Sequence, residues 1–90
     1  MDRTTFVAEL KRDGFELVER EMAANHTNPE HAHDFDARVM VLKGEITITR
    51  DGVATTYRAG DSCAVPRGAR HAEEVGPEGV SYIAGRRMPA

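Results

Sequence analysis

Two histidines stand two residues apart in the segment EHAHDFDARVMVLKGE, residues 30–45. An imidazole is costly to bury without a partner, and in its neutral form it is also the commonest metal ligand in proteins. A first-row divalent ion accepts imidazole nitrogens at about 2.0–2.2 Å, but it needs at least a third protein ligand. His31 and His33 therefore predict either part of a metal site or a pair of packed side chains.

A third histidine follows in the segment GDSCAVPRGARH, residues 60–71. Gly60 opens a turn, a short strand follows, and Pro66 and Gly68 form a second turn. The second turn fixes the angle at which His71 begins the next strand, and a metal ligand needs such a fixed direction. We therefore expect His71 to complete a ligand set with the histidine pair.

Strand alternation explains how the pair could reach such a site. If residues 32–42 are extended, successive side chains point to opposite faces. The two imidazoles then share a face with apolar residues and enter the mouth of a barrel with an apolar floor. On the other face we expect surface ion pairing of Arg38 with Asp34 and Asp36, of little energetic weight. The inward set is His31, His33, Phe35, Ala37, Val39 and Val41.

The elements around these residues are mostly strands. A short N-terminal helix is expected first, capped by Thr4 or Thr5 and ended by Gly14, with apolar residues at helical spacing: Phe6, Val7 and Leu10. Five segments of strand character follow: FELVEREM, RVMVLKGEITITR, VATTYRA, SCAVP and VSYIAG. Asp51-Gly52 predicts a tight hairpin, and residues 23–30 are expected to be a polar loop. This order favours an all-β sandwich or barrel.

Two motifs in this sequence resemble those of the cupin superfamily. The first, G-x5-H-x-H-x3-4-E-x6-G, spans residues 25–44 and is matched by His31, His33 and Gly44. The second, G-x5-P-x-G-x2-H-x3-N, spans residues 60–75 and is matched by Gly60, Pro66, Gly68 and His71. Asn25 stands where the first motif has glycine, Ala37 where it has glutamate, and Val75 where the second has asparagine.

The resemblance implies one cupin domain over residues 1–90, an all-β double-stranded β-helix (a jelly-roll barrel) with a short N-terminal helix. It implies a divalent transition metal, Fe, Ni, Zn or Mn, held by His31, His33 and His71. The missing carboxylate at Ala37 leaves two substitutes. Glu73 shares the inward face with His71 and is a candidate general base or further ligand, whereas alternation points Asp36 outward.

Three kinds of function remain open. The first is a metal-dependent enzyme, dioxygenase-like or isomerase-like, acting on a small chelating substrate. The second is a non-catalytic module that binds or senses a small ligand. The third is a structural cupin whose metal holds the barrel closed, and the fold alone does not choose among them.

The composition indicates which classes of partner the protein lacks and where in the cell it is expected. With 12 basic and 15 acidic residues the chain carries a net charge of −3, which offers no general attraction to nucleic acid or anionic membranes. The single cysteine, Cys63, leaves no internal disulfide, and we expect a cytoplasmic protein. A small barrel gains stability from a partner, so we expect a homodimer formed through the edge strand FELVEREM or an exchanged N-terminal segment.

The remaining polar residues have ordinary interpretations. His26 is expected to be a loop histidine and not a fourth ligand, because Pro29 separates it from the pair. Cys63 is expected to be a small core residue and not a reactive thiol. Arg86 and Arg87 follow the last expected strand, where they are either solvated or available to a carboxylate or a partner subunit.

Overall fold

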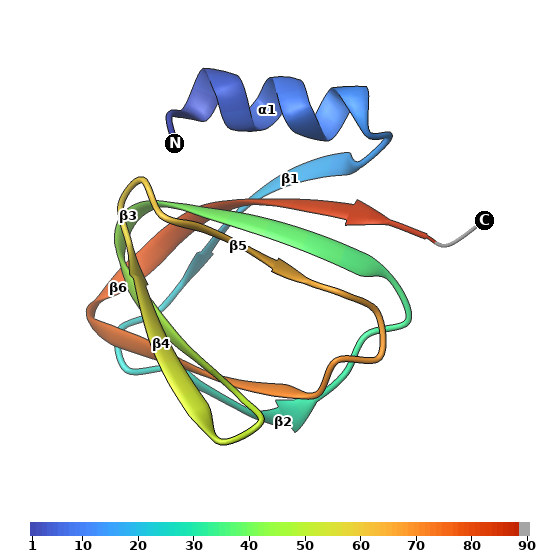
Figure 1. Ribbon diagram of the computed structural model, residues 1–90. Helices are drawn as coiled ribbons and strands as arrows, with labels where there is room; N and C mark the ends of the chain where they lie inside the picture. Colours follow the sequence, from blue (N-terminus) through green and yellow to red (C-terminus); the bar gives the residue numbers. More distant parts are fainter. Residues whose placement is uncertain (89–90) are drawn as a thin grey trace.

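The computed structural model describes residues 1–88. It has one helix and six strands, and all the strand pairs are antiparallel. Figure 1 shows the strands wrapped into a jelly-roll barrel with the helix outside it, so the expected fold class is confirmed. The elements are α1 Arg3–Arg12, β1 Glu16–Met22, β2 Thr27–His31, β3 Asp36–Arg50, β4 Val53–Arg58, β5 Ser62–Val65 and β6 His71–Arg87.

The helix is capped differently from the expectation. Asp2, and not Thr4 or Thr5, is the N-cap, and its carboxylate accepts a hydrogen bond from the backbone N–H of Thr5 at 2.8 Å. A carboxylate at this position satisfies one of the unpaired N–H groups of the first turn. At the other end Gly14 has a positive φ of 77°, so it ends the helix as expected. Within residues 1–88 no helix is long and apolar enough to cross a membrane.

Two long strands carry most of the barrel. β6 pairs with β1, β2 and β3, and β3 pairs with β4, β5 and β6. The β3–β6 register shifts twice, between Val41 and Lys43 and between Gly44 and Ile46. Such shifts bend a strand and increase its twist, which lets a single pair of strands curve around the core. The hairpin between β3 and β4 lies at Asp51 and Gly52, both with positive φ, as the sequence predicts.

Two expectations about strands are wrong. Residues 27–30 were expected in a polar loop, but with His31 they form β2, a largely exposed strand that pairs with β6. Pro29 is compatible with a strand that has a free side. The extended segment over residues 32–42 is also interrupted, because β3 begins only at Asp36 and residues 32–35 belong to no strand.

The apolar side chains form two clusters on opposite sides of the barrel wall. One lies between α1 and the strands, where Phe6 and Leu10 are fully buried against Phe15, Met40 and Ile83. The other fills the inside of the barrel, with Val41, Ile46, Ile48, Val75 and Val80. Met40 and Val41, adjacent in β3, therefore serve different clusters, as strand alternation requires. Two members of the inner cluster, Ile46 and Ile48, line the same cavity as His31 and His33.

Candidate metal centre

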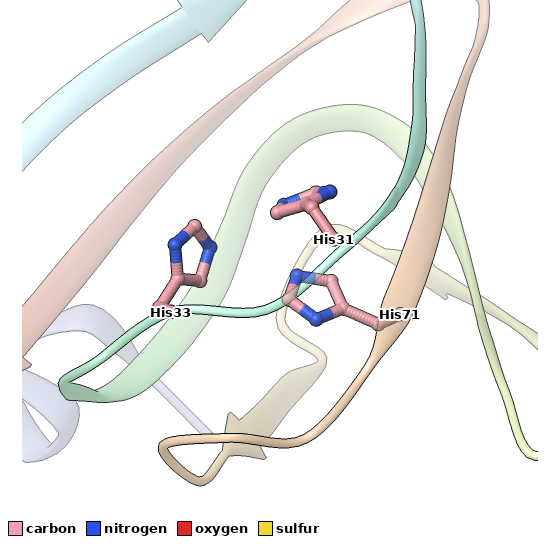
Figure 2. Close-up of side chains that lie close together, drawn as sticks. All are labelled: His31, His33 and His71. Carbon is pink, nitrogen blue, oxygen red and sulfur yellow. The ribbon is translucent and has the colours of Figure 1, made fainter.

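Three histidines from separate parts of the chain meet at the open end of the barrel. His31 ends β2, His33 lies in the connection to β3, and His71 begins β6. His31 and His71 are register partners across the β2–β6 pair. One ring nitrogen of each histidine lies within 4.8 Å of one of each of the others, and Figure 2 shows the three rings gathered around a common space. The expected clustering of the three side chains is therefore present.

Backbone carbonyl groups orient two of the three rings. The Nδ1–H of His31 donates to the carbonyl of Pro29 at 2.7 Å, and that of His71 donates to the carbonyl of Ala69 at 3.0 Å. In each case the acceptor lies two residues earlier in the chain. A histidine that donates from Nδ1 keeps its Nε2 lone pair available, which is the arrangement found in metal-ligating histidines.

His33 is held by aromatic packing. Its ring stacks on that of Phe35 with centroids 4.6 Å apart and an interplanar angle of 18°. Burial lowers the pKa of His33, and the nearby imidazoles of His31 and His71 lower it further. A lowered pKa favours the neutral ring, which is the form that binds a metal.

The donor set fits a divalent transition metal ion. Three imidazoles whose ring nitrogens lie within 4.8 Å of one another, two of them already oriented, suit first-row divalent ions. His71 is only 2 % exposed, so it forms the inner side of the site, while His31 and His33 face a cavity. Three protein ligands would leave further coordination positions open on that side.

The cavity beside the histidines has a volume of about 440 Å³, within the usual range for small-molecule sites. Most of its wall is apolar and comes from β3 and β6. Its polar lining, besides His31 and His33, comes from four side chains: Asn28, Glu73, Tyr82 and Arg86. Such a cavity with a few convergent polar groups is the common form of a ligand site.

Glu73 lies beside the histidine cluster, on the inward face where it was expected. Its Oε1 is 3.8 Å from Nε2 of His31 and accepts a hydrogen bond from the side-chain amide of Asn28 at 2.8 Å. The side-chain oxygen of Asn28, Oδ1, is in turn 2.9 Å from Nε2 of His26. His26 itself is exposed and lies outside the three-histidine cluster, in accord with its expected place away from the ligand set.

The chain matches a family model described as a cupin domain over residues 18–82. The chain belongs to the cupin family. This cupin is similar to an RmlC-like cupin of Shewanella frigidimarina, with 28 % identity and a TM-score of 0.70 over 80 % of this chain and 64 % of that one. A cupin-2 barrel protein of Salinispora arenicola has 27 % identity and a TM-score of 0.71 over 84 % of this chain and 64 % of that one.

A third similar structure is the polyketide cyclase RemF of Streptomyces resistomycificus. It has 26 % identity and a TM-score of 0.68, and the match covers 84 % of this cupin and 57 % of the cyclase. This cupin thus spans less than two thirds of the length of each of these three structures. No curated protein sequence matches it.

The departures from the cupin motifs have structural consequences. Asn25, at the glycine position, has a φ of 62°, and asparagine is among the residues that best tolerate this left-handed conformation. Ala37, at the glutamate position, lines the cavity and offers no ligand atom. Asp36 points away from it, and its carboxylate accepts a hydrogen bond from the backbone N–H of Arg67 at 3.1 Å. The outward placement of Asp36 is therefore confirmed.

The arginines differ from the expectation. Arg38 pairs with Glu9 of α1 at 3.0 Å, and not with Asp34 or Asp36. Asp36 pairs instead with Arg87 at 3.3 Å. Neither ion pair could be predicted from neighbours in one strand, because in each pair the two residues come from elements that are distant in the sequence.

Arg86 and Arg87 also do not follow the last strand, because β6 extends through both. They end in different surroundings. Arg87 stacks over Phe15 at 4.5 Å, outside the cavity, whereas Arg86 lies over Phe35 at 5.1 Å and lines the cavity. Sequence reasoning also missed Asn28 as a cavity residue, and only its pairing with Glu73 across β2 and β6 reveals it.

Proposed function

We propose that this cupin binds a divalent transition metal ion through His31, His33 and His71, and that it is an enzyme of the dioxygenase-like or isomerase-like kind. The observation that carries the proposal is the convergence of three imidazoles, two with Nδ1 held by backbone carbonyls, beside a cavity of about 440 Å³. When bound, the ion would supply Lewis-acid chemistry, or oxygen activation if it is Fe(II).

The protein side chains would bind and orient a small chelating substrate. The apolar wall of the cavity would contact the body of such a molecule. Glu73, held by Asn28 at 2.8 Å, is the general-base candidate because its carboxylate already faces the site. The cyclase RemF, at 26 % identity, supports an enzymatic role for this barrel.

The second candidate is a non-catalytic module that binds or senses a small ligand. It is favoured by Ala37, because the wall that would carry a fourth protein ligand is apolar. The ligand would use the same cavity and the same histidines. A metal that only holds β2 to β6 is the structural alternative, since His31 and His71 are register partners across that pair.

Elemental analysis of protein purified without an affinity tag tests the metal site. We expect near-stoichiometric transition metal in the wild type and its loss in His31→Ala and His71→Ala. His26→Ala is the matched control and should keep the metal, because His26 lies outside the cluster. Folded wild-type protein that neither contains metal nor binds added Fe, Ni or Zn would contradict the proposal.

A second experiment separates enzyme from binding module. Oxygen consumption by the Fe(II)-loaded protein is measured with thiols, diketones and catechols, and product formation is followed in parallel with Zn, Ni and Mn. Turnover that disappears in His71→Ala supports the enzyme. No turnover, together with a ligand that raises the melting temperature, supports the binding module.

A further inference from the structure

Arg86 is a charged side chain at the cavity that the proposed metal site does not use. Its guanidinium lies 5.1 Å from the centroid of the Phe35 ring and lines the same cavity as His31 and His33. In the part of the chain that the structure describes, no carboxylate lies within 4.0 Å of it. Arg87, the next residue, is paired with Asp36. The positive charge of Arg86 is thus available to a ligand.

The register of β3 and β6 places the charge of Arg86 next to a position of the first cupin motif. Arg86 is the direct partner of Ala37, the position where the first cupin motif has its glutamate. Directly opposite residues in an antiparallel pair have Cβ atoms about 4.5–5.5 Å apart. The wall that lacks a protein carboxylate therefore has a guanidinium beside it, and the small Ala37 side chain leaves space between Arg86 and the histidines.

The charge balance of the cavity also favours an anion. Glu73 is the one acidic side chain among the described residues that line it, and Asn28 already donates to its carboxylate. A divalent ion held by neutral histidines would add positive charge, which a bound anion would offset. A guanidinium binds a carboxylate through two parallel N–H groups, whose directional fit a point charge lacks.

We propose that the cavity takes a small organic carboxylate whose carboxyl group binds Arg86 above Ala37, while its other end reaches the histidine site. The Phe35 ring, stacked with His33 and covered by Arg86, forms the wall along which the carboxyl group approaches. This inference rests on the proposed function for the metal end of the ligand. The carboxylate end depends on Arg86 alone.

Calorimetric titration of the metal-loaded protein with catechol and with 3,4-dihydroxybenzoate tests the inference. The two probes share the chelating end and differ in the carboxylate. A charge-assisted hydrogen bond at a partly exposed site corresponds to a preference of about tenfold for the carboxylate probe. Because the carboxyl group also changes the acidity of the catechol, the deciding quantity is the change in the affinity ratio on substitution.

Arg86→Gln should lower that ratio by about tenfold, with catechol affinity and metal content unchanged. Arg86→Lys should keep part of the preference, and Arg87→Gln, outside the cavity, all of it. An unchanged ratio in Arg86→Gln would overturn the inference while leaving the metal site intact. If the protein proves to contain no metal, only the proposed function is contradicted. Titration with benzoate and benzamide then measures whether binding of a carboxylate depends on Arg86. Equal benzoate affinity in the wild type and Arg86→Gln would overturn the inference as well.

Discussion

Glu73 and its neighbour Glu74 provide a test of side-chain placement at the site. Glu73 lines the cavity 3.8 Å from His31, whereas Glu74 is exposed. We expect Glu73→Gln to keep the metal but to lower turnover by about 10²–10⁴-fold, the usual contribution of a general base. Glu74→Gln should leave both unchanged. Metal analysis and turnover of the two variants check this, and loss of metal in Glu73→Gln would make Glu73 a ligand instead of a base.

Cys63 illustrates the opposite case, a reactive residue type made inert by its surroundings. Burial raises the pKa of its thiol to about 11. Because the thiolate is the nucleophile, a raised pKa means fewer thiolates at a given pH, and alkylation at pH 8 should be about a hundredfold slower than for an ordinary cysteine. The rate with iodoacetamide, compared with the urea-unfolded protein, checks this. Equal rates in the folded and unfolded states would show that Cys63 is accessible.

The types and spacing of His31, His33 and His71, in two motifs that resemble those of cupins, were sufficient to predict that they would meet. Strand alternation was not the reason for His33, because residues 32–35 belong to no strand. The polar side chains that surround the histidines were not predictable in the same way. Asn28 lies in a segment whose polar composition resembles a loop, and Arg86 could be placed only once the β3–β6 register was known. Long-range register, and not residue type, decides which polar side chains reach the cavity.

At the scale of elements, the crossing of β3 and β6 depends on Gly44. A Cβ at this position would overlap the carbonyl oxygen of Gly79, and its φ is +78°. Gly52 has nearly the same φ, +77°, but has open space around it. Gly52→Ala should therefore cost only the backbone strain, about 1–2 kcal/mol of unfolding free energy. Gly44→Ala should cost at least about 3 kcal/mol, because the two strands must also separate.

Urea unfolding of the two glycine variants measures this difference. Equal losses of stability would show that strain, and not contact with Gly79, governs position 44. The hairpin at Asp51-Gly52 was predictable because a dipeptide specifies it locally. The Gly44–Gly79 contact was not, since its two members lie far apart in the sequence and meet where the β3–β6 register shifts.

The difference between local signals and long-range pairing also explains which strands the sequence predicts. β1, β4 and β5 are short, and turn residues bound them. β2 escaped prediction because it has an exposed polar pattern with a proline, and only its backbone pairing to β6 makes it a strand. β6 has 17 residues and continues through Gly76 and Pro77, which the sequence suggests are a break. Tertiary pairing overrides local propensity in β2, whereas in β6 the pairing with β3 skips residues 76–79, where the register shifts.

For the whole molecule, the free edge of β1 bears on assembly. Among the described residues β1 pairs only with β6, so one side of its backbone is unpaired. A free strand edge is a template for pairing with a second copy, and we expect a homodimer at micromolar concentration. Val18→Lys, on β1, should weaken the dimer at least about tenfold, because a lysine on an edge disfavours pairing. Val53→Lys, on the exposed end of β4, is the control.

Sedimentation across a concentration series measures the dimer constant of the three proteins. A strictly monomeric wild type would exclude the dimer, and equal weakening by both lysine variants would exclude β1 as its interface. Because α1 packs against β1, the melting temperature of Val18→Lys should be measured in parallel. At a concentration where the wild type is also monomeric, an unchanged melting temperature shows that the substitution acts on the interface and not on the fold.

Metal binding should stabilise the entire fold, because the three histidines join β2, the connection to β3 and the start of β6. A ligand that binds only the folded state at a free concentration 100 times its Kd adds about 2.7 kcal/mol to the free energy of unfolding. For a domain of this size that corresponds to a rise in Tm of about 10–20 °C. The Tm of the metal-free protein should rise on adding the ion and fall again with a chelator. His26→Ala should behave as the wild type, whereas His71→Ala should show no rise. An equal rise in His71→Ala would mean that the ion binds elsewhere on the folded chain, and the three histidines would then have only a packing role.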